Sequence, residues 1–215
     1  MRIGILGTGA MTAALGARFV RAGHEVVIGS RSPDRARALR ASIGAVDGGG
    51  YRFAAHADVV IVAVRDTEVL QIVESVADVL GGSVVIDLNN PLDPASSESR
   101  YAGQASLGER VAEAVPAARV VKAFNTVYAE WLAPDAEKGL APVQVFLASD
   151  DDDAKAVVTA LVHQIDAEPV DVGPLRVARQ LESLAGFEVG LVDRGLAPFV
   201  GLRLIAGREA PAAGA

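Results

Sequence analysis

A glycine-rich turn near the start of the chain constrains its fold more than any other feature. Gly7-Thr8-Gly9 follows a short apolar run, 2–6, precedes a helix-like segment, 10–22, and is followed by a second apolar run, 25–28. This order predicts the first βαβ unit of a dinucleotide-binding fold. Gly7 permits the tight turn and Gly9 lets the backbone approach a pyrophosphate, which free N–H groups and the helix dipole then stabilise. The residues predicted to bind it are Gly7, Thr8, Gly9, Ala10 and Met11.

The end of the second apolar run indicates which dinucleotide is bound. NAD sites usually place Asp or Glu there to hold the ribose 2′-hydroxyl, whereas this chain continues Gly29-Ser30-Arg31 and reaches Arg35 four residues later. A carboxylate would repel a 2′-phosphate, while guanidinium groups and a serine hydroxyl donate hydrogen bonds to it. We therefore predict NADP(H) as the cofactor, with Ser30, Arg31 and Arg35 on its 2′-phosphate. The alternative is that Arg31 and Arg35 are solvated charges at the start of a helix.

One position departs from the glycine fingerprint. Its third place is Thr12, where Gly or Ala would allow close packing of helix on strand. Because threonine is larger and β-branched, we expect the helix to stand slightly farther from the first strand, unless Ala13, Ala14 or Gly16 restores the approach.

Composition excludes several classes of protein. The formal charge of −7 and pI near 5.0 argue against a nucleic-acid binder, which needs a basic face. The chain has no cysteine, and its three histidines are too scattered to form a metal site, so we expect no bound metal. An apolar run starting at residue 2 leaves no room for a signal peptide, and no run approaches membrane-spanning length. These features predict a cytoplasmic protein without membrane contact.

Strand and helix patterns alternate along the whole chain. They predict a Rossmann-type doubly wound parallel α/β sheet, with a small C-terminal α/β extension packed on it. The expected division is an NADP-binding domain, 1–140, and a C-terminal part, 141–215, that completes the cleft. The predicted strands are 2–6, 25–28, 51–53, 57–64, 83–88, 119–123, 142–148 and 168–172, and the predicted helices are 10–22, 34–43, 67–80, 109–115, 150–165 and 175–192.

Two further segments need a structural interpretation. Four consecutive aspartates, 150–153, resemble a metal site, but side chains at successive positions of a helix start point in different directions. We interpret them as solvated acids that complement the helix dipole, with Ser149 as the cap. The glycine run 48–50 is expected to be a flexible connection, and the tail 209–215 to be frayed.

Several blocks taken together resemble a known family. GILGTGAMT, VVIGSRSPDRA, VVIDLNNPL, VVKAFNT, DVGPL and RQLESLA follow one another in the order found in F420-dependent NADP reductases and in the related oxidoreductase domain of membrane ferric reductases. The first block is generic, whereas the later blocks are specific as a set. The resemblance implies a Rossmann domain, a small C-terminal part that forms a pocket over the nicotinamide, and a homodimer.

The chemistry implied by this resemblance is hydride transfer between NADP(H) and the deazaflavin coenzyme F420. Such a reaction needs alignment of two rings more than an acid or base, because the cofactors carry the chemistry. Val64 and Ala123 are expected to keep water from the rings, and the strand-end residues Asn89, Asn90 and Asn125 to bind the nicotinamide amide or ribose. The alternative for the asparagines is turn formation. Cations for the acidic F420 tail would come from Arg176, Arg179, Arg194 and Arg203.

Two other functions stay open. If the acceptor is a small imine or carbonyl compound, a proton donor is needed at the reducing centre, and the candidates are Tyr128, Lys122, Asp87 and Arg65. Lys122 could instead pair with Asp87, and Tyr128 could pack against Trp131. The third possibility is a noncatalytic NADP(H) sensor, which the departure at Thr12 would suit. The apolar tract 195–205 is the candidate dimer surface, unless a monomer buries it.

Overall fold

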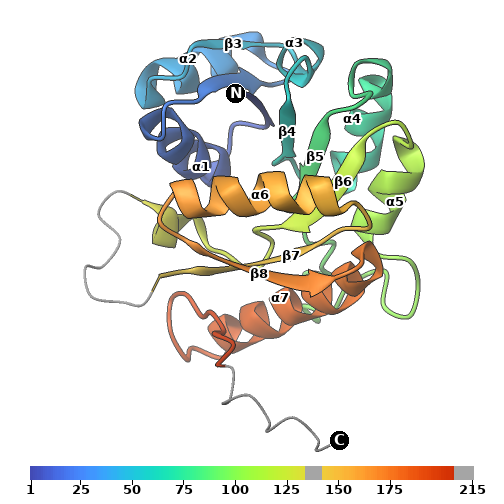
Figure 1. Ribbon diagram of the computed structural model, residues 1–215. Helices are drawn as coiled ribbons and strands as arrows, with labels where there is room; N and C mark the ends of the chain where they lie inside the picture. Colours follow the sequence, from blue (N-terminus) through green and yellow to red (C-terminus); the bar gives the residue numbers. More distant parts are fainter. Residues whose placement is uncertain (134–141, 206–215) are drawn as a thin grey trace, which may run out of the picture.

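A computed structural model describes residues 1–133 and 142–205. One eight-stranded sheet with strand order β3-β2-β1-β4-β5-β6-β7-β8 runs through the molecule (Figure 1). Strands β1 to β6 are parallel, β7 is antiparallel to β6, and β8 is parallel to β7. The strands are Arg2–Leu6, Glu25–Gly29, Asp47–Gly49, Val59–Val62, Val84–Asp87, Arg119–Ala123, Gln144–Ala148 and Glu168–Gly173. The predicted doubly wound α/β fold is confirmed.

Helices cover both faces of this sheet because its central strands are apolar on both sides. One face packs against α1, α2 and α6, through side chains such as Leu15, Phe19 and Val158. The other packs against α3, α4, α5 and α7, through Val73, Val111 and others. The helices are Ala10–Arg21, Pro33–Ile43, Tyr51–Ala55, Val69–Ser75, Leu107–Ala114, Asp152–Gln164 and Ala178–Asp193. In the described residues, no helix has the length and apolar character to cross a membrane.

Thr12 and Gly16 both lie on the side of α1 that faces the protein interior. Thr12 is fully buried. A Cβ on Gly16 would lie 2.6 Å from Ile43 Cδ1 of α2, so the end of that side chain would have to move, but 3.6 Å from Ile5 Cδ1 of β1, an ordinary contact distance. The compensation for Thr12 that we expect at Gly16 therefore stays a prediction.

The third strand is the main error of the sequence interpretation. Residues 51–53 were expected to form it and 48–50 to be flexible, but Asp47–Gly49 forms β3 and Tyr51–Ala55 forms α3. Gly48 is required there, since a Cβ would lie 2.7 Å from the carbonyl oxygen of Ala36 in α2. The glycines thus serve close packing of a strand beneath a helix, a reason that their composition alone does not reveal.

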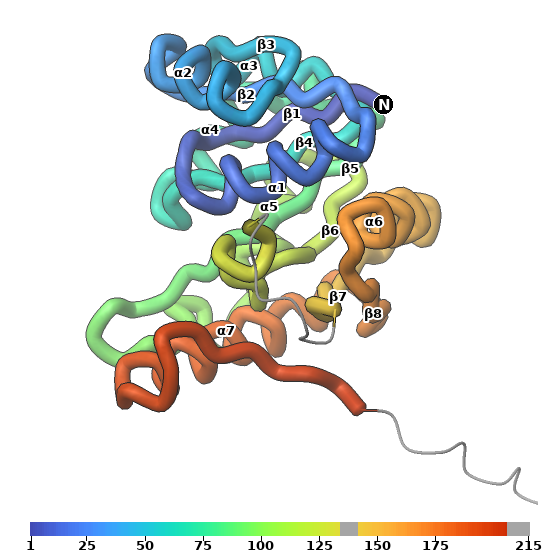
Figure 2. Tube along the Cα trace, turned by 90° about the vertical axis from the view of Figure 1, so that its left-hand side faces the viewer, coloured from blue at the N-terminus to red at the C-terminus, as the bar shows by residue number. Residues whose placement is uncertain are grey.

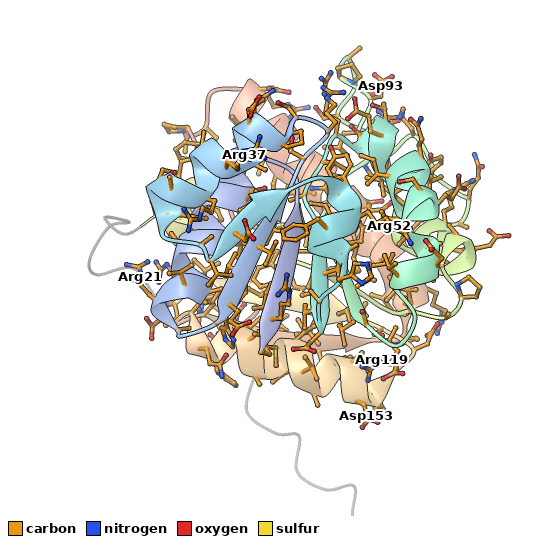
Figure 3. The ribbon with its side chains drawn as sticks, turned by 90° about the horizontal axis from the view of Figure 1, so that it is seen from above. Arg21, Arg37, Arg52, Asp93, Arg119 and Asp153 are labelled. Atoms are coloured by element: carbon orange, nitrogen blue, oxygen red, sulfur yellow. The ribbon has the colours of Figure 1, made fainter. Side chains whose placement is uncertain are left out.

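Helix ends differ from the predictions where side chains compete for capping. The helix expected at 150–165 starts after Asp151, whose side chain accepts a hydrogen bond from the Ala154 N–H at 2.7 Å; Ser149 instead donates to the Val120 carbonyl at 2.6 Å. Asp153 lies at the outer edge of the molecule (Figure 3), as expected for a solvated acid. The helix expected at 67–80 is interrupted and only Val69–Ser75 is α-helical, whereas α5 begins two residues early, after a Ser106–Glu109 capping box.

The C-terminal part extends the same sheet. Lys122 and Ala123 of β6 pair with Ala148 and Leu147 of β7, and α7 then runs beside the loop that follows β5 (Figure 2). The predicted boundary at residue 140 and the tail 209–215 lie outside the described residues, so the division into two parts stays a prediction.

Candidate functional site

The turn after β1 is held between two neighbouring strands. The Gly7 N–H donates to the Gly29 carbonyl of β2 at 2.8 Å, and Gly7 has a positive φ of 129°. A Cβ at this position would lie 1.9 Å from the carbonyl oxygen of Ala63, which follows β4. Only glycine therefore fits the place where β1, β2 and β4 end together.

The start of α1 offers free hydrogen-bond donors next to this turn. Gly9 is its N-cap and provides no side chain, so the first N–H groups of the helix, those of Ala10 and Met11, have no capping partner. An ideal Cβ on Gly9 would meet no atom within 4 Å, which means that the backbone faces open space. This uncapped helix end, with its positive dipole, is suited to bind an anion.

A hollow of about 320 Å³ opens in front of these donors. Three arginines, Arg31, Arg35 and Arg65, line it together with Ser30, which is nearly buried and accepts the Ser32 N–H at 3.2 Å. Cationic side chains thus gather at one end of a pocket whose other end is the glycine turn. Its lining residues are Gly7, Thr8, Gly9, Ser30, Arg31, Arg35, Tyr51, Ala63, Val64, Arg65 and Glu68.

A single carboxylate enters the same hollow. Glu68 Oε1 lies 2.9 Å from Arg31 Nη1 and 4.0 Å from Arg65 Nε. A second hollow of about 320 Å³ continues beyond this ion pair, between Arg31 and Tyr51 on one side and Gln71, Ile72 and Ser75 of α4 on the other. The two hollows together extend from the glycine turn to the outer surface of α4.

The asparagines at the ends of β5 and β6 bond to protein groups. Asn89 Nδ2 donates to the Val62 carbonyl at 2.7 Å and to Asp87 Oδ1 at 2.8 Å. Asn90 Nδ2 donates to the Asn125 carbonyl at 2.6 Å, while Asn125 Nδ2 donates to Asn90 Oδ1 and to the Leu181 carbonyl of α7, both at 2.9 Å. Asn125 Oδ1 is buried with no partner among the described residues. The asparagines join both strand ends to α7, and their cofactor-binding role stays a prediction.

Lys122 is completely buried next to Asn89. Its ammonium group donates to Asp87 Oδ2 at 2.8 Å, to the Asn89 carbonyl at 2.5 Å and to Glu182 Oε1 of α7 at 2.9 Å. The Glu182 carboxylate also accepts the N–H groups of Leu107 and Gly108 at the start of α5, where the helix dipole stabilises negative charge. All three ammonium hydrogens therefore have acceptors, which favours a structural role over proton donation.

Tyr128 packs in an aromatic group, as the alternative interpretation expected. Its ring contacts Trp131 at a centroid distance of 5.2 Å and Phe199 at 5.4 Å. The hydroxyl is buried without a hydrogen-bond partner in the described chain, and burial together with the nearby charge of Glu188 raises the pKa of Tyr128. A neutral, unpaired phenol is chemically able to donate a proton, so Tyr128 stays a candidate.

Glu188 is a second buried group near this aromatic cluster. Its side chain on α7 is 2% exposed and accepts the Leu202 N–H at 3.3 Å. Burial raises the pKa of Glu188 to about 7. The segment after α7 is thus bound through Leu202 to a buried carboxyl group of that helix.

Two of the four arginines proposed for an acidic ligand tail are already paired. Arg179 binds Glu109 through two hydrogen bonds of 2.7 and 2.8 Å and lowers the pKa of that carboxyl to about 2, while Arg203 binds Glu168 at 2.5 Å. Arg194 lines a separate hollow of about 510 Å³ between α7 and the loop after β5. The cation set expected for F420 is therefore dispersed over the surface.

The structure brings together one half of the predicted site residues and separates the other. Gly7, Thr8 and Gly9 line one pocket with Val64 and the three predicted residues after β2, and Ala10 and Met11 follow the turn at the start of α1 outside the lining. Asn89, Asn90, Ala123 and Asn125 lie at the ends of β5 and β6, also outside it. The sequence did not indicate Tyr51, Ala63 and Glu68 as lining residues, and it offered Arg65 only as a candidate proton donor. Leu6 of β1 pairs with Val62 of β4, so Arg65 and Glu68, which follow β4, lie at the same edge as the glycine turn. No cluster of potential metal ligands occurs in the part of the chain described.

Comparisons with known proteins agree with this geometry. The family model for "NADP oxidoreductase coenzyme F420-dependent" matches residues 2–91. An F420-dependent NADP reductase of Methanothermobacter thermautotrophicus is 31% identical over 95% of this chain and 94% of its own. Metalloreductase STEAP3 of Rattus norvegicus is 32% identical over 85% of this chain, which spans only 36% of that protein. A proposed F420-dependent NADP reductase of Arthrobacter sp. FB24 has a structure that superposes with a TM-score of 0.85, at 26% identity and over 95% of this chain and 99% of its own.

Proposed function

Because the chain belongs to the family of F420-dependent NADP reductases and is an NADP-dependent oxidoreductase, we propose that it transfers a hydride between NADP(H) and coenzyme F420. The observation that carries this proposal is the pocket in which an uncapped helix start faces three arginines and a serine. The coenzyme is proposed from relatives of about 30% identity, and the direction of transfer is left to the experiment below.

The pocket fits NADP(H) in both its shape and its donors. The backbone at Gly7, Thr8, Gly9, Ala10 and Met11 would hold the pyrophosphate, since Gly9 leaves open space and the start of α1 is uncapped. Ser30, Arg31 and Arg35 would hold the 2′-phosphate, because they lie beyond the end of β2 in the same pocket. Both anionic groups thus meet donors that the protein does not otherwise use fully.

The other role that the proposal gives to this chain is to align the two reacting rings. NADP(H), when bound, supplies the hydride, and the protein has to hold the two reacting rings at near-attack distance. Val64 follows β4 and Ala123 ends β6, so apolar groups would lie at the edge where the nicotinamide is expected. Lys122 holds the Asn89 carbonyl, and Asn90 holds Asn125, so the loops around this edge are fixed by internal bonds.

The experiment is to mix the purified protein with NADPH and oxidised F420, follow the F420 absorbance, and repeat with NADP⁺ and reduced F420. We expect turnover in at least one direction, and strong loss of it in Arg31→Ala/Arg35→Ala. The control Arg37→Ala, on the outer side of α2, should keep the rate. Tight NADPH binding without F420 turnover would contradict the proposal and favour the sensor.

A second candidate, reduction of a small imine or carbonyl compound, is favoured by the unpaired Tyr128 hydroxyl. Such a reaction needs a proton donor, which hydride transfer to F420 does not. NADPH consumption with cyclic imines or ketones, absent with F420 and lost in Tyr128→Phe, would establish it. Turnover with F420 that Tyr128→Phe leaves intact would exclude Tyr128 as a required donor.

We also propose a homodimer formed through the segment after α7. Leu196, Phe199, Leu202, Leu204 and Ile205 expose apolar side chains there, and adjoining exposed apolar groups mark interaction surfaces. Light scattering should give the dimer mass for the native protein and the monomer mass for Leu204→Glu/Ile205→Glu; a monomeric native protein would contradict the proposal.

A cytoplasmic location is likewise proposed, and fractionation of cells that express the protein tests it.

A further inference from the structure

Glu68 places a negative charge where the NADP(H) phosphate is expected. Its Oε1 lies 2.9 Å from Arg31 Nη1, and the side chain lines the same hollow as Ser30, Arg35 and the glycine turn. Only 27% of the Glu68 side chain is exposed, against 59% for Arg31. The carboxylate is therefore the less exposed member of the pair, and more than half of the Arg31 side chain is open to solvent.

Capping does not account for this orientation. Glu68 is the residue before α4, a position where an acidic side chain often accepts hydrogen bonds from the first helical N–H groups. Here its side chain makes no capping bond. Asp66, in the same short turn, is bound by Arg100. Among the described residues, the charged groups near the Glu68 carboxylate are therefore Arg31 and, farther away, Arg65.

A phosphate that binds Arg31 has to share it with this carboxylate or displace it. Charges only a few ångströms apart interact strongly even at a protein surface, and a phosphate monoester carries nearly two negative charges at neutral pH. An unmodified ribose 2′-hydroxyl meets no such repulsion, and a carboxylate can accept its hydrogen bond. Glu68 thus acts against the phosphate and not against the hydroxyl.

We propose that Glu68 determines nucleotide selectivity by competing with the 2′-phosphate for Arg31, which lowers the preference for NADP(H) over NAD(H). The inference rests on the 2′-phosphate position given under Proposed function, but not on the identity of the hydride acceptor. It predicts a protein that binds NADP(H) reversibly with moderate affinity and still accepts NAD(H), because the glutamate offsets part of the charge of the three arginines.

The test is a fluorescence titration of NADPH and NADH against the native protein, Glu68→Gln and the control Glu74→Gln. Glu74→Gln makes the same change of net charge as Glu68→Gln. Because Glu74 lies exposed on α4 outside both hollows, its substitution leaves the site itself unaltered. For Glu68→Gln we expect NADPH to bind about 3- to 10-fold more tightly, as expected when about 1 kcal/mol of repulsion is removed, with NADH unchanged or weaker. Glu74→Gln should leave the ratio of the two dissociation constants unaltered.

The Arg31→Ala background separates competition from a general effect of charge. If Glu68 acts through Arg31, Glu68→Gln should alter the NADPH to NADH ratio much less when Arg31 is absent. A preference for NADPH over NADH that stays constant or decreases in Glu68→Gln would overturn the proposal, and a decrease would show that Glu68 orients Arg31 for the phosphate. Thermal unfolding of each variant shows that it is folded. Failure of F420 turnover would not affect these titrations, and failure of the titrations would not affect F420 turnover.

Discussion

The two ends of the proposed cleft differ in how far the protein satisfies its own polar groups. At the ends of β1 and β2 the backbone faces open space, α1 has no cap, and Arg35 has no ion-pair partner within the described part of the chain. At the ends of β5 and β6, Asn89, Asn90 and Lys122 bond to protein partners at 2.5 to 2.9 Å. The ends of β1 and β2, called the open end below, are suited to bind an external anion. The ends of β5 and β6, called the joint below, are linked to α7 by hydrogen bonds of Asn125 and Lys122.

Removal of the buried Lys122 ammonium should lower the free energy of unfolding more than any other substitution considered below. Lys122→Met leaves Asp87 and Glu182 as uncompensated buried carboxylates, so we expect a loss of about 3–5 kcal/mol in the free energy of unfolding, measured with urea. The control is Lys155→Met, because Lys155 also has two carboxylate partners, Asp152 and Asp171, but at the surface. Equal losses in both variants would contradict a special role for burial. If Lys122→Met does not fold, Asp87→Asn/Lys122→Met/Glu182→Gln should restore stability.

Glu188 should make the stability of the α7 side depend on pH. Its pKa is raised from 4.5 to about 7 in the folded state, so the folded protein holds the proton more tightly and loses stability as pH rises from about 4.5 to 7. Glu188→Gln stays neutral and keeps an acceptor for the Leu202 N–H. We expect it to be more stable than the native protein by about 3 kcal/mol at pH 8 and similar at pH 4, since each pKa unit is about 1.4 kcal/mol. A constant difference from pH 4 to 8 would refute this.

Arg31→Ala should weaken NADPH binding without unfolding the protein. Because hydrogen bonds to charged groups contribute about 1.5–3 kcal/mol, we expect the NADPH dissociation constant to rise roughly 10- to 100-fold, with NADH much less affected. Arg37→Ala, in α2 just after Arg31 and paired with Asp34, is the matched control. An unchanged NADPH dissociation constant in Arg31→Ala would show that the 2′-phosphate lies elsewhere.

Substitution of Asn90 has the smallest expected effect, and it tests whether the asparagines at the ends of β5 and β6 bind the cofactor. Asn90→Ala removes two hydrogen bonds to Asn125 and should lower the free energy of unfolding by about 1–2 kcal/mol. If the asparagines only join strand ends, the NADPH dissociation constant stays within twofold of the native value in the same titration. A tenfold rise would instead support the role in nicotinamide binding predicted from the sequence.

The open end could be predicted from sequence because its parts are local. Gly7, Gly9, Ser30 and Arg31 belong to one βαβ unit, and the requirement for glycine or a cation at each place follows from the backbone path. The third strand could not be predicted in this way. Asp47–Gly49 has the composition of a flexible connection, and its strand conformation depends on packing against α2 and pairing with β2.

The joint was beyond prediction for a related reason. Lys122 and Asp87 are adjacent through strand pairing, and that pair was foreseen as an alternative. Glu182 lies 60 residues further along and meets Lys122 only through the tertiary packing of α7, which follows β8, the last strand of the sheet. Glu68 is an intermediate case, since strand order brings it near Arg31, but nothing local shows which way its side chain turns.

The ion triad of Lys122 also governs how the molecule can open. Because α7 contributes Glu182 to an ammonium that β6 carries and β5 shares, detachment of the helix alone would leave buried charge without a partner. Local detachment of α7 at this place is therefore strongly disfavoured. The first half of α7 and the central strands should consequently exchange their amide hydrogens with solvent together, as one cooperative unit, while the segment beyond residue 195 exchanges much faster.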